Sequence, residues 1–182
     1  LIFAPVQSFF IALFLIFMIL VFQFNSYSQP LMILYTVVLA TLGVNIWLFI
    51  TGNPYSMTFG IGFIALTGIV VNDAIILIDR INRNLDRLNR NFAHGTLQKE
   101  DYIKAMMAAG RSRLEPIIVT TLTTVFWVLP LALQDPFWAG LWFTIIFGLT
   151  MGSLMTLFVI PALYYAIYLN KKIREGLPPV QE

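Results

Sequence analysis

Long, uniformly apolar stretches alternate with short polar breaks along this chain. An α-helix needs about 20 mainly apolar residues to cross a bilayer, and five stretches meet this requirement, covering residues 5–24, 31–50, 57–78, 116–133 and 137–169. Because these stretches do not alternate between apolar and polar residues, the pattern excludes the strands of a membrane barrel. The sequence therefore predicts an all-α, polytopic membrane protein whose five transmembrane helices form one domain over residues 1–170.

The breaks between the stretches contain residues that form turns. Residues 25–30 separate the first two stretches, Thr51–Pro54 the next two, and Asp135-Pro136 the last two. The last stretch is too long for one straight span, and Pro161 inside it predicts a kink.

The segment of residues 79–115 is soluble in character. Its apolar residues recur at helical spacing with arginines between them, at Ile81, Leu85, Leu88 and Phe92. This pattern predicts that the third span continues into an amphipathic helix. His94–Thr96 interrupts the pattern, and Thr96 is a candidate cap for a second short helix that ends near Ser112. We expect a helix pair that lies on the membrane surface between the third and fourth spans.

Composition and charge placement sharpen this prediction. The chain is 59% hydrophobic and only 11% charged, against about 25% charged residues in soluble domains, so an ordinary soluble protein is excluded. Of its eleven Lys+Arg residues, eight lie within residues 79–115 and three within the tail of residues 171–182. The positive-inside rule makes both regions cytoplasmic and the N-terminus extracytoplasmic. A net charge of +2 gives no indication of nucleic-acid binding.

Catalytic and metal-binding motifs find little support in the sequence. The chain has no cysteine and a single histidine, and it contains no HExxH motif, nucleophile elbow or P-loop. We therefore predict no catalytic residue, no metal site and no organic cofactor, and we do not expect an enzyme. The chain begins at Leu1 with no basic region before its first apolar stretch, so we expect it to be part of a longer protein.

Asp73 is the most informative residue, because it lies inside the third span. A carboxylate there costs roughly 2.5–3.5 kcal/mol on insertion scales and is tolerated when it faces a partner, a cavity or a proton path. The alternative is an aspartate near the cytoplasmic end that pairs with a basic residue, since Asp79 follows only six residues later. We interpret Asp73 as a functional group.

Two further patterns lie on the fourth and fifth spans. Arg113 and Thr120 are seven residues apart and so share a helix face, although Arg113 could equally serve only as a topological charge. Gly148 and Gly152 belong to a row of small residues spaced four apart. Such spacing lets helices approach closely, so we interpret the two glycines as packing residues.

Four segments, in order, resemble the C-terminal membrane portion of the resistance-nodulation-division (RND) efflux transporters, helices eight to twelve of their twelve. These segments are Phe24–Leu31, Gly68–Ile75, Gly110–Thr121 and Val159–Tyr164. The resemblance implies a trimer in the bacterial inner membrane that exports hydrophobic or amphiphilic compounds in exchange for protons. It also implies the remaining permease, with helices one to seven and the extracytoplasmic domains, and a periplasmic adaptor as partners alongside the lipid bilayer.

The resemblance also implies a proton relay between a helix-four aspartate pair, which is absent from this chain, and groups on helices ten and eleven. Arg113 and Thr120 match the helix-eleven groups of the relay. The well-studied drug pumps have a lysine where this chain has Asn72, and an asparagine where it has Asp73. The lysine switch therefore does not transfer. We hypothesise that Asp73 titrates in its place, with Asn72 as a neutral hydrogen-bond partner.

Three alternatives to drug export remain open. The chain could be a structural or regulatory membrane fragment, or it could belong to a protein-export accessory relative of the same superfamily. Metal-efflux relatives rely on clusters of methionine and acidic residues in the membrane, whereas the seven methionines here are scattered, which disfavours that class.

Overall fold

All five elements are α-helices in the computed structural model, which describes residues 3–52, 56–91 and 99–174. Among the described residues, four helices are long and apolar enough to cross a membrane, and the first helix contributes a shorter apolar stretch, Phe9–Phe24. This confirms the all-α, polytopic membrane fold. The helices are α1 (Phe3–Phe24), α2 (Ser28–Thr51), α3 (Met57–Asn91), α4 (Lys99–Gln134) and α5 (Pro136–Arg174).

The polar breaks end and begin helices as their residue types predict. Asn25, between α1 and α2, has φ 46°, a left-handed conformation that asparagine tolerates better than most residues. Gly52 ends α2 with φ 65°, and its N–H donates to the Leu48 carbonyl at 2.9 Å. Asp135 caps α5, because its Oδ1 accepts from the Phe137 N–H at 2.9 Å.

Within the described residues, the third span continues into the amphipathic segment as the pattern predicts, but the second helix does not end near Ser112. α3 continues unbroken to Asn91, and α4 runs from Lys99 through Pro116 to Gln134. A proline inside a helix removes one backbone hydrogen bond, and α4 nevertheless continues through Pro116, which is exposed. The candidate cap Thr96 lies outside the described residues.

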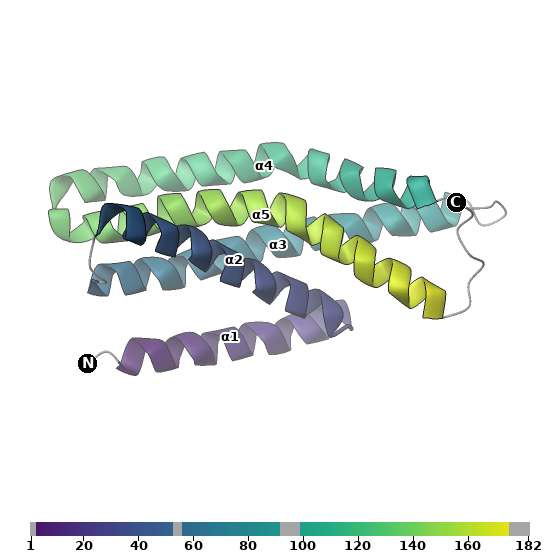
Figure 1. Ribbon diagram of the computed structural model, residues 1–182, viewed down its shortest axis with the longest axis horizontal. Coiled ribbons are helices and arrows are strands. Elements are labelled where there is room, and N and C mark those ends of the chain that lie inside the picture. The colour runs from purple at the N-terminus through teal and green to yellow at the C-terminus, as the bar shows by residue number, and fades with distance from the viewer. Residues whose placement is uncertain (1–2, 53–55, 92–98, 175–182) are drawn as a thin grey trace.

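α5 occupies the centre of the bundle and packs against α2, α3 and α4, whereas α1 packs mainly against α2 (Figure 1). α3 and α4 run antiparallel, and their C-terminal and N-terminal parts extend together toward the right of Figure 1. α5 bends in its second half, where Pro161 lies inside the helix. This agrees with the kink that the proline predicts.

Close approaches at glycines hold α5 against its neighbours. A Cβ added at Gly148 would contact Val44 of α2 at 2.6 Å and would also meet Leu66 of α3, and one at Gly152 would lie 2.9 Å from Val70 of α3. These separations are shorter than van der Waals contact, so a side chain at either position requires the neighbouring side chains to shift.

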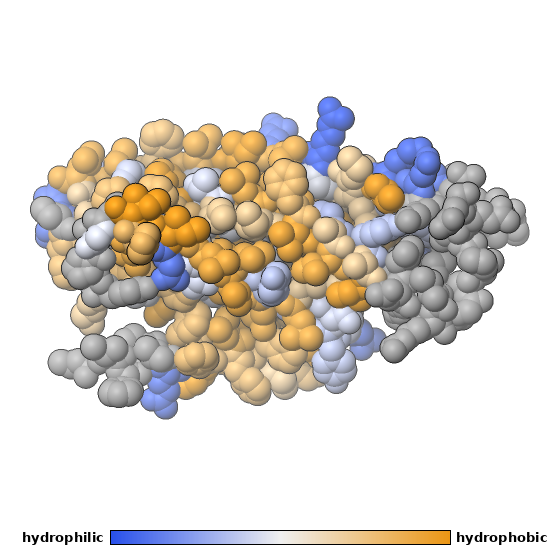
Figure 2. Space-filling model, viewed as in Figure 1, coloured by the Kyte–Doolittle hydropathy of each residue, from blue (hydrophilic) through white to orange (hydrophobic). Residues whose placement is uncertain are grey.

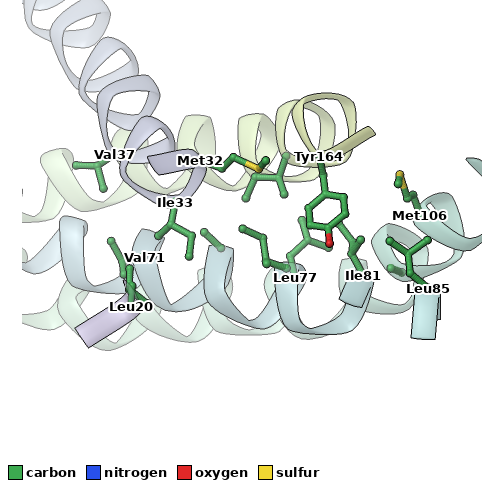
Figure 3. Packing of buried hydrophobic residues seen from close by; sticks show 14 of the residues in the cluster. Leu20, Met32, Ile33, Val37, Val71, Leu77, Ile81, Leu85, Met106 and Tyr164 are labelled. Atoms are coloured by element: carbon green, nitrogen blue, oxygen red, sulfur yellow. The ribbon is translucent and has the colours of Figure 1, made fainter. Parts of the chain in front are cut away.

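The buried side chains form two clusters. One lies where the C-terminal half of α3 packs against α4 and α5, and it includes residues such as Leu77, Ile81, Met106 and Tyr164 (Figure 3). The other contains Trp47, which stacks on Phe143 with ring centroids 4.6 Å apart. Figure 2 shows apolar side chains covering the middle of the visible face, with hydrophilic side chains denser toward the right-hand end. That distribution suits a bundle whose midsection lies in lipid.

Candidate functional site: a buried carboxyl group in the third helix

Asp73 is buried in the α3 span, with only 4% of the residue exposed. Its Oδ2 atom is buried and has no hydrogen-bond partner. No basic side chain in the described part of the chain pairs with it; the nearest acidic residue along α3, Asp79, is bonded instead to Arg83 at 2.8 Å. The alternative in which Asp73 merely pairs with a nearby basic residue therefore finds no support in the geometry.

The helix face that carries Asp73 meets both α4 and α5. At about 100° per residue, Leu66, Asp73 and Asn84 fall on one face of α3. Leu66 contacts α5 at Gly148, and the Asn84 Nδ2 donates to the Ala105 carbonyl of α4 at 3.0 Å. Asp73 lies between these two contacts and so points toward the seam between α4 and α5.

The same contacts show which residues of α4 and α5 lie at the same height along the bundle as Asp73. Because Asn84 lies opposite Ala105 on the antiparallel α4, Asp73, eleven residues earlier, is level with Pro116. Val70 lies opposite Gly152 on the parallel α5, so Asp73, three residues later, is level with residue 155. The neighbourhood of Asp73 is therefore the middle of both partner helices.

Hydroxyl groups lie in the seam between α4 and α5, near the level of Asp73. The Thr121 Oγ1 of α4 and the Ser153 Oγ of α5 are 3.4 Å apart. Ser153 is 8% exposed and Thr156 is fully buried, and the Thr156 hydroxyl donates to the Gly152 carbonyl at 2.7 Å. Thr121 and Ser153 thus form a small polar strip inside an otherwise apolar interface.

No hydrogen bond joins Asp73 Oδ2 to the other predicted relay residues in the described part of the chain. Asn72 is exposed on the surface of α3, about 100° around the helix from Asp73, so the two residues face different neighbours. Thr120 is also exposed, and its hydroxyl donates to the Ile117 carbonyl of its own helix at 3.0 Å. Arg113 is partly buried, and its Nε has no hydrogen-bond partner. These residues stay predictions, and the exposed ones lie where a further protein segment could cover them.

Sequence reasoning did not single out Thr121 and Ser153 as part of this site. Neither residue has a pattern of its own, because a hydroxyl group is common in membrane helices and usually bonds to its own backbone. Thr121 does bond in this way, to the Ile117 carbonyl at 2.8 Å. Only the crossing of α4 over α5 brings it to Ser153.

No group of three or more His, Asp or Glu side chains that could hold a metal ion occurs among the residues that the structure describes. The arrangement around Asp73 can bind and release a proton, because a carboxyl group and neighbouring hydroxyl groups exchange hydrogen bonds as the carboxyl changes charge.

Comparison with known proteins gives consistent matches. A family model described as the AcrB/AcrD/AcrF family matches residues 5–168. The swarming motility protein SwrC of Bacillus subtilis is 31% identical over 170 residues, which cover 91% of this chain and 15% of that protein. The multidrug resistance protein MdtC of Erwinia tasmaniensis is 34% identical over 172 residues, covering 92% of this chain and 16% of that protein.

Among solved structures, that of a heavy metal efflux pump matches with a TM-score of 0.66 and 29% sequence identity, covering 87% of this chain and 15% of that chain. The chain spans about 15% of the length of the curated relatives that it matches. The matched region includes all four segments on which the family resemblance was based.

Proposed function

This chain belongs to the AcrB/AcrD/AcrF family of RND efflux permeases, and we propose on that basis that it forms the helix-eight to helix-twelve part of a proton-driven exporter of hydrophobic or amphiphilic compounds. The rest of the permease supplies helices one to seven and the extracytoplasmic domains. The complete protein lies in the bacterial inner membrane as a homotrimer and works with a periplasmic adaptor. The C-terminal tail, the C-terminal end of α3 and the N-terminal end of α4 face the cytoplasm.

The observation that supports a proton role is the burial of Asp73 without a partner for its Oδ2. An ionised carboxylate in an apolar interior is costly unless it is paired, and no cation in the described part of the chain pairs with this one. Taking up a proton removes that cost, and releasing it restores the charge. Asp73 therefore stores a proton at the depth where the family relay operates.

Arg113, Thr120 and Asn72 complete the proposed relay from this side of the membrane domain. The unpartnered Nε of Arg113 offers a hydrogen bond to a carboxylate supplied by the other half of the permease. The exposure of Thr120 and Asn72 suits residues that face the helix-four carboxyl groups across the interface between the two halves.

The test compares two aspartate-to-asparagine variants in the full-length protein. Asp73→Asn keeps the size of the side chain but removes the titrating group, so proton-coupled export of an amphiphilic dye should fall to the level of cells without the transporter. Asp79→Asn, at a partly exposed residue ion-paired with Arg83, is the matched control and should retain export within about twofold, because a surface ion pair contributes only about 0–1 kcal/mol. Unchanged dye export by Asp73→Asn would refute the proton role.

Metal ions are the second candidate cargo, because the heavy metal efflux pump structure is similar to this chain. Cells that express the full-length protein should show raised resistance to amphiphilic dyes and detergents under the main proposal. Raised resistance to copper, silver or zinc salts, with no change toward dyes, would favour the metal-efflux class.

A further inference from the structure

We infer that Asn82 and Asn84 fix the rotation of α3 and thereby hold Asp73 in the seam between α4 and α5. They are positioning residues and take no part in proton transfer themselves. We call Asn82 and Asn84, with their bonding partners Gln29, Tyr164 and Ala105, the amide clamp. The inference deepens the proposed function, on which the role of Asp73 rests, but the rotation of α3 can be measured independently of transport.

One side of the amide clamp is a three-residue network at the cytoplasmic ends of α2, α3 and α5. The Asn82 Oδ1 accepts from the Tyr164 hydroxyl at 2.5 Å and from the Gln29 Nε2 at 3.3 Å. The Asn82 Nδ2 donates in return to the Gln29 Oε1 at 3.2 Å. Both functional ends of the Asn82 amide are therefore engaged, and they tie α3 to two helices at once.

The other side is the bond from the Asn84 Nδ2 to the Ala105 carbonyl of α4, at 3.0 Å. The acceptor is a backbone group, so it cannot follow α3 by changing a side-chain rotamer. Tyr102 and Met106, on either side of Ala105, are both buried, which keeps this part of α4 in place.

Asn82 and Asn84 are two residues apart, which places them about 200° apart around the helix. The hydrogen bonds of the amide clamp therefore hold α3 on two nearly opposite sides. Any rotation of α3 about its axis breaks bonds on at least one side. The apolar contacts around the clamp are less directional, because hydrophobic burial depends on area and not on orientation.

The consequence for the site follows from the same spacing. Asn84 and Asp73 are eleven residues apart, about 20° from alignment on the helix, so the bond to α4 fixes the direction in which Asp73 points. A rotation of about 100° would exchange Asp73 for Asn72. Without the clamp, the carboxyl group could leave the polar strip of Thr121 and Ser153.

A disulfide between Val70→Cys and Gly152→Cys can report this rotation. A Cβ at position 152 lies 2.9 Å and 3.6 Å from the two Cγ atoms of Val70, so positions 70 and 152 are adjacent across the interface of α3 and α5, as a disulfide requires. Val70→Cys also removes one of the two Cγ atoms that the new side chain at position 152 would crowd. The chain contains no cysteine, so the two introduced thiols are the only ones it supplies to the full-length protein. Rotation of α3 carries position 70 away from α5 and slows cross-linking.

The experiment measures the initial rate of oxidative cross-linking in membranes that contain the full-length protein. Adding Asn82→Leu and Asn84→Leu should slow cross-linking measurably, because a loss of about 1 kcal/mol lowers the ratio of aligned to rotated protein about fivefold. Asn89→Leu, an exposed asparagine of the same helix, is the matched control and should leave the rate unchanged. Exchanging the two amides, with Gln29→Asn and Asn82→Gln together in a protein that keeps Asn84, preserves a hydrogen bond between positions 29 and 82. This variant should retain most of the cross-linking rate of the protein that carries only the two cysteines.

An unchanged cross-linking rate in the double-leucine variant would overturn the inference. If that variant does not fold, Tyr164→Phe removes a single hydroxyl group and should still slow cross-linking measurably, and an unchanged rate there overturns the inference equally. Slower cross-linking with unaffected dye export would support the amide clamp and refute the proton role of Asp73, so the two proposals fail separately.

Discussion

Replacing Gly43 by alanine tests most directly how α2 and α5 are held together. Gly43 is buried in the middle of α2, and an added Cβ would overlap Met151 Cβ, with Met151 Cγ at 2.8 Å and the Phe147 carbonyl oxygen at 3.2 Å. Two of these atoms are fixed to the α5 backbone, so no rotamer change relieves the overlap. The two helices must move apart.

The size of the effect follows from two opposing contributions. Alanine in place of glycine favours a helix by about 1 kcal/mol, whereas inserting a methyl group into a well-packed interface costs typically about 1–3 kcal/mol. Because the Gly43 overlap involves backbone-anchored atoms, we take the upper value and expect Gly43→Ala to destabilise the protein by about 2 kcal/mol. Gly68→Ala is the matched control, since its Cβ would meet nothing within 4 Å.

Stability is measured as the thermal midpoint of the full-length protein in detergent, followed by the loss of the monodisperse peak in gel filtration. Gly43→Ala should lower the midpoint, and Gly68→Ala should leave it unchanged or raise it. Separation of α2 from α5 should also disturb Trp47, which lies one turn from Gly43 and stacks on Phe143 and Phe147 of α5. Equal midpoints for the two alanine variants would show that the close approach of α2 and α5 does not limit stability.

Three further substitutions have predictable outcomes. Gly152→Leu introduces a branched side chain where even a Cβ has no room, so we expect the folded protein to be lost from membrane fractions, and normal expression would contradict the packing. Ser153→Ala removes the hydroxyl group that lies 3.4 Å from the Thr121 hydroxyl. It should lower the stability of the protein by about 0.6 kcal/mol, the average for hydrogen bonds between membrane helices. A fall in the thermal midpoint as large as that caused by a cavity in the core would contradict this. Asp135→Ala removes the cap on the Phe137 N–H and should cost about 1 kcal/mol, with Asp135→Asn as the control that retains a capping oxygen.

The sequence by itself determined the class of the protein and the positions of the turns at Gly52 and Asp135. Long, uniformly apolar stretches are stable in lipid and not in water. In lipid, a helix is the structure in which the backbone N–H and C=O groups of a single segment bond to one another. The turn at Gly52 and the cap at Asp135 follow equally from local chemistry, because a left-handed residue or a side-chain acceptor acts within a few residues of its own position.

Local patterns did not determine how far two of the helices extend. The break expected after Ser112 does not occur, and α4 continues through Pro116 despite the backbone hydrogen bond that a proline removes. The sequence located Asp73 inside an apolar span, where the cost of a charge depends on its position along the span. It did not show that Asn72, the adjacent residue, faces a different neighbour.

Only the tertiary structure decided which groups surround Asp73. Thr121 and Ser153 meet because α4 crosses α5, and the amide groups of Asn82 and Asn84 acquire partners because helices distant in sequence lie beside α3. Hydrophobicity is non-directional and specifies that these helices associate without specifying their rotation. Hydrogen bonds are directional, and their partners exist only once the helices have packed, so the orientation of the buried carboxyl group is a property of the assembled bundle.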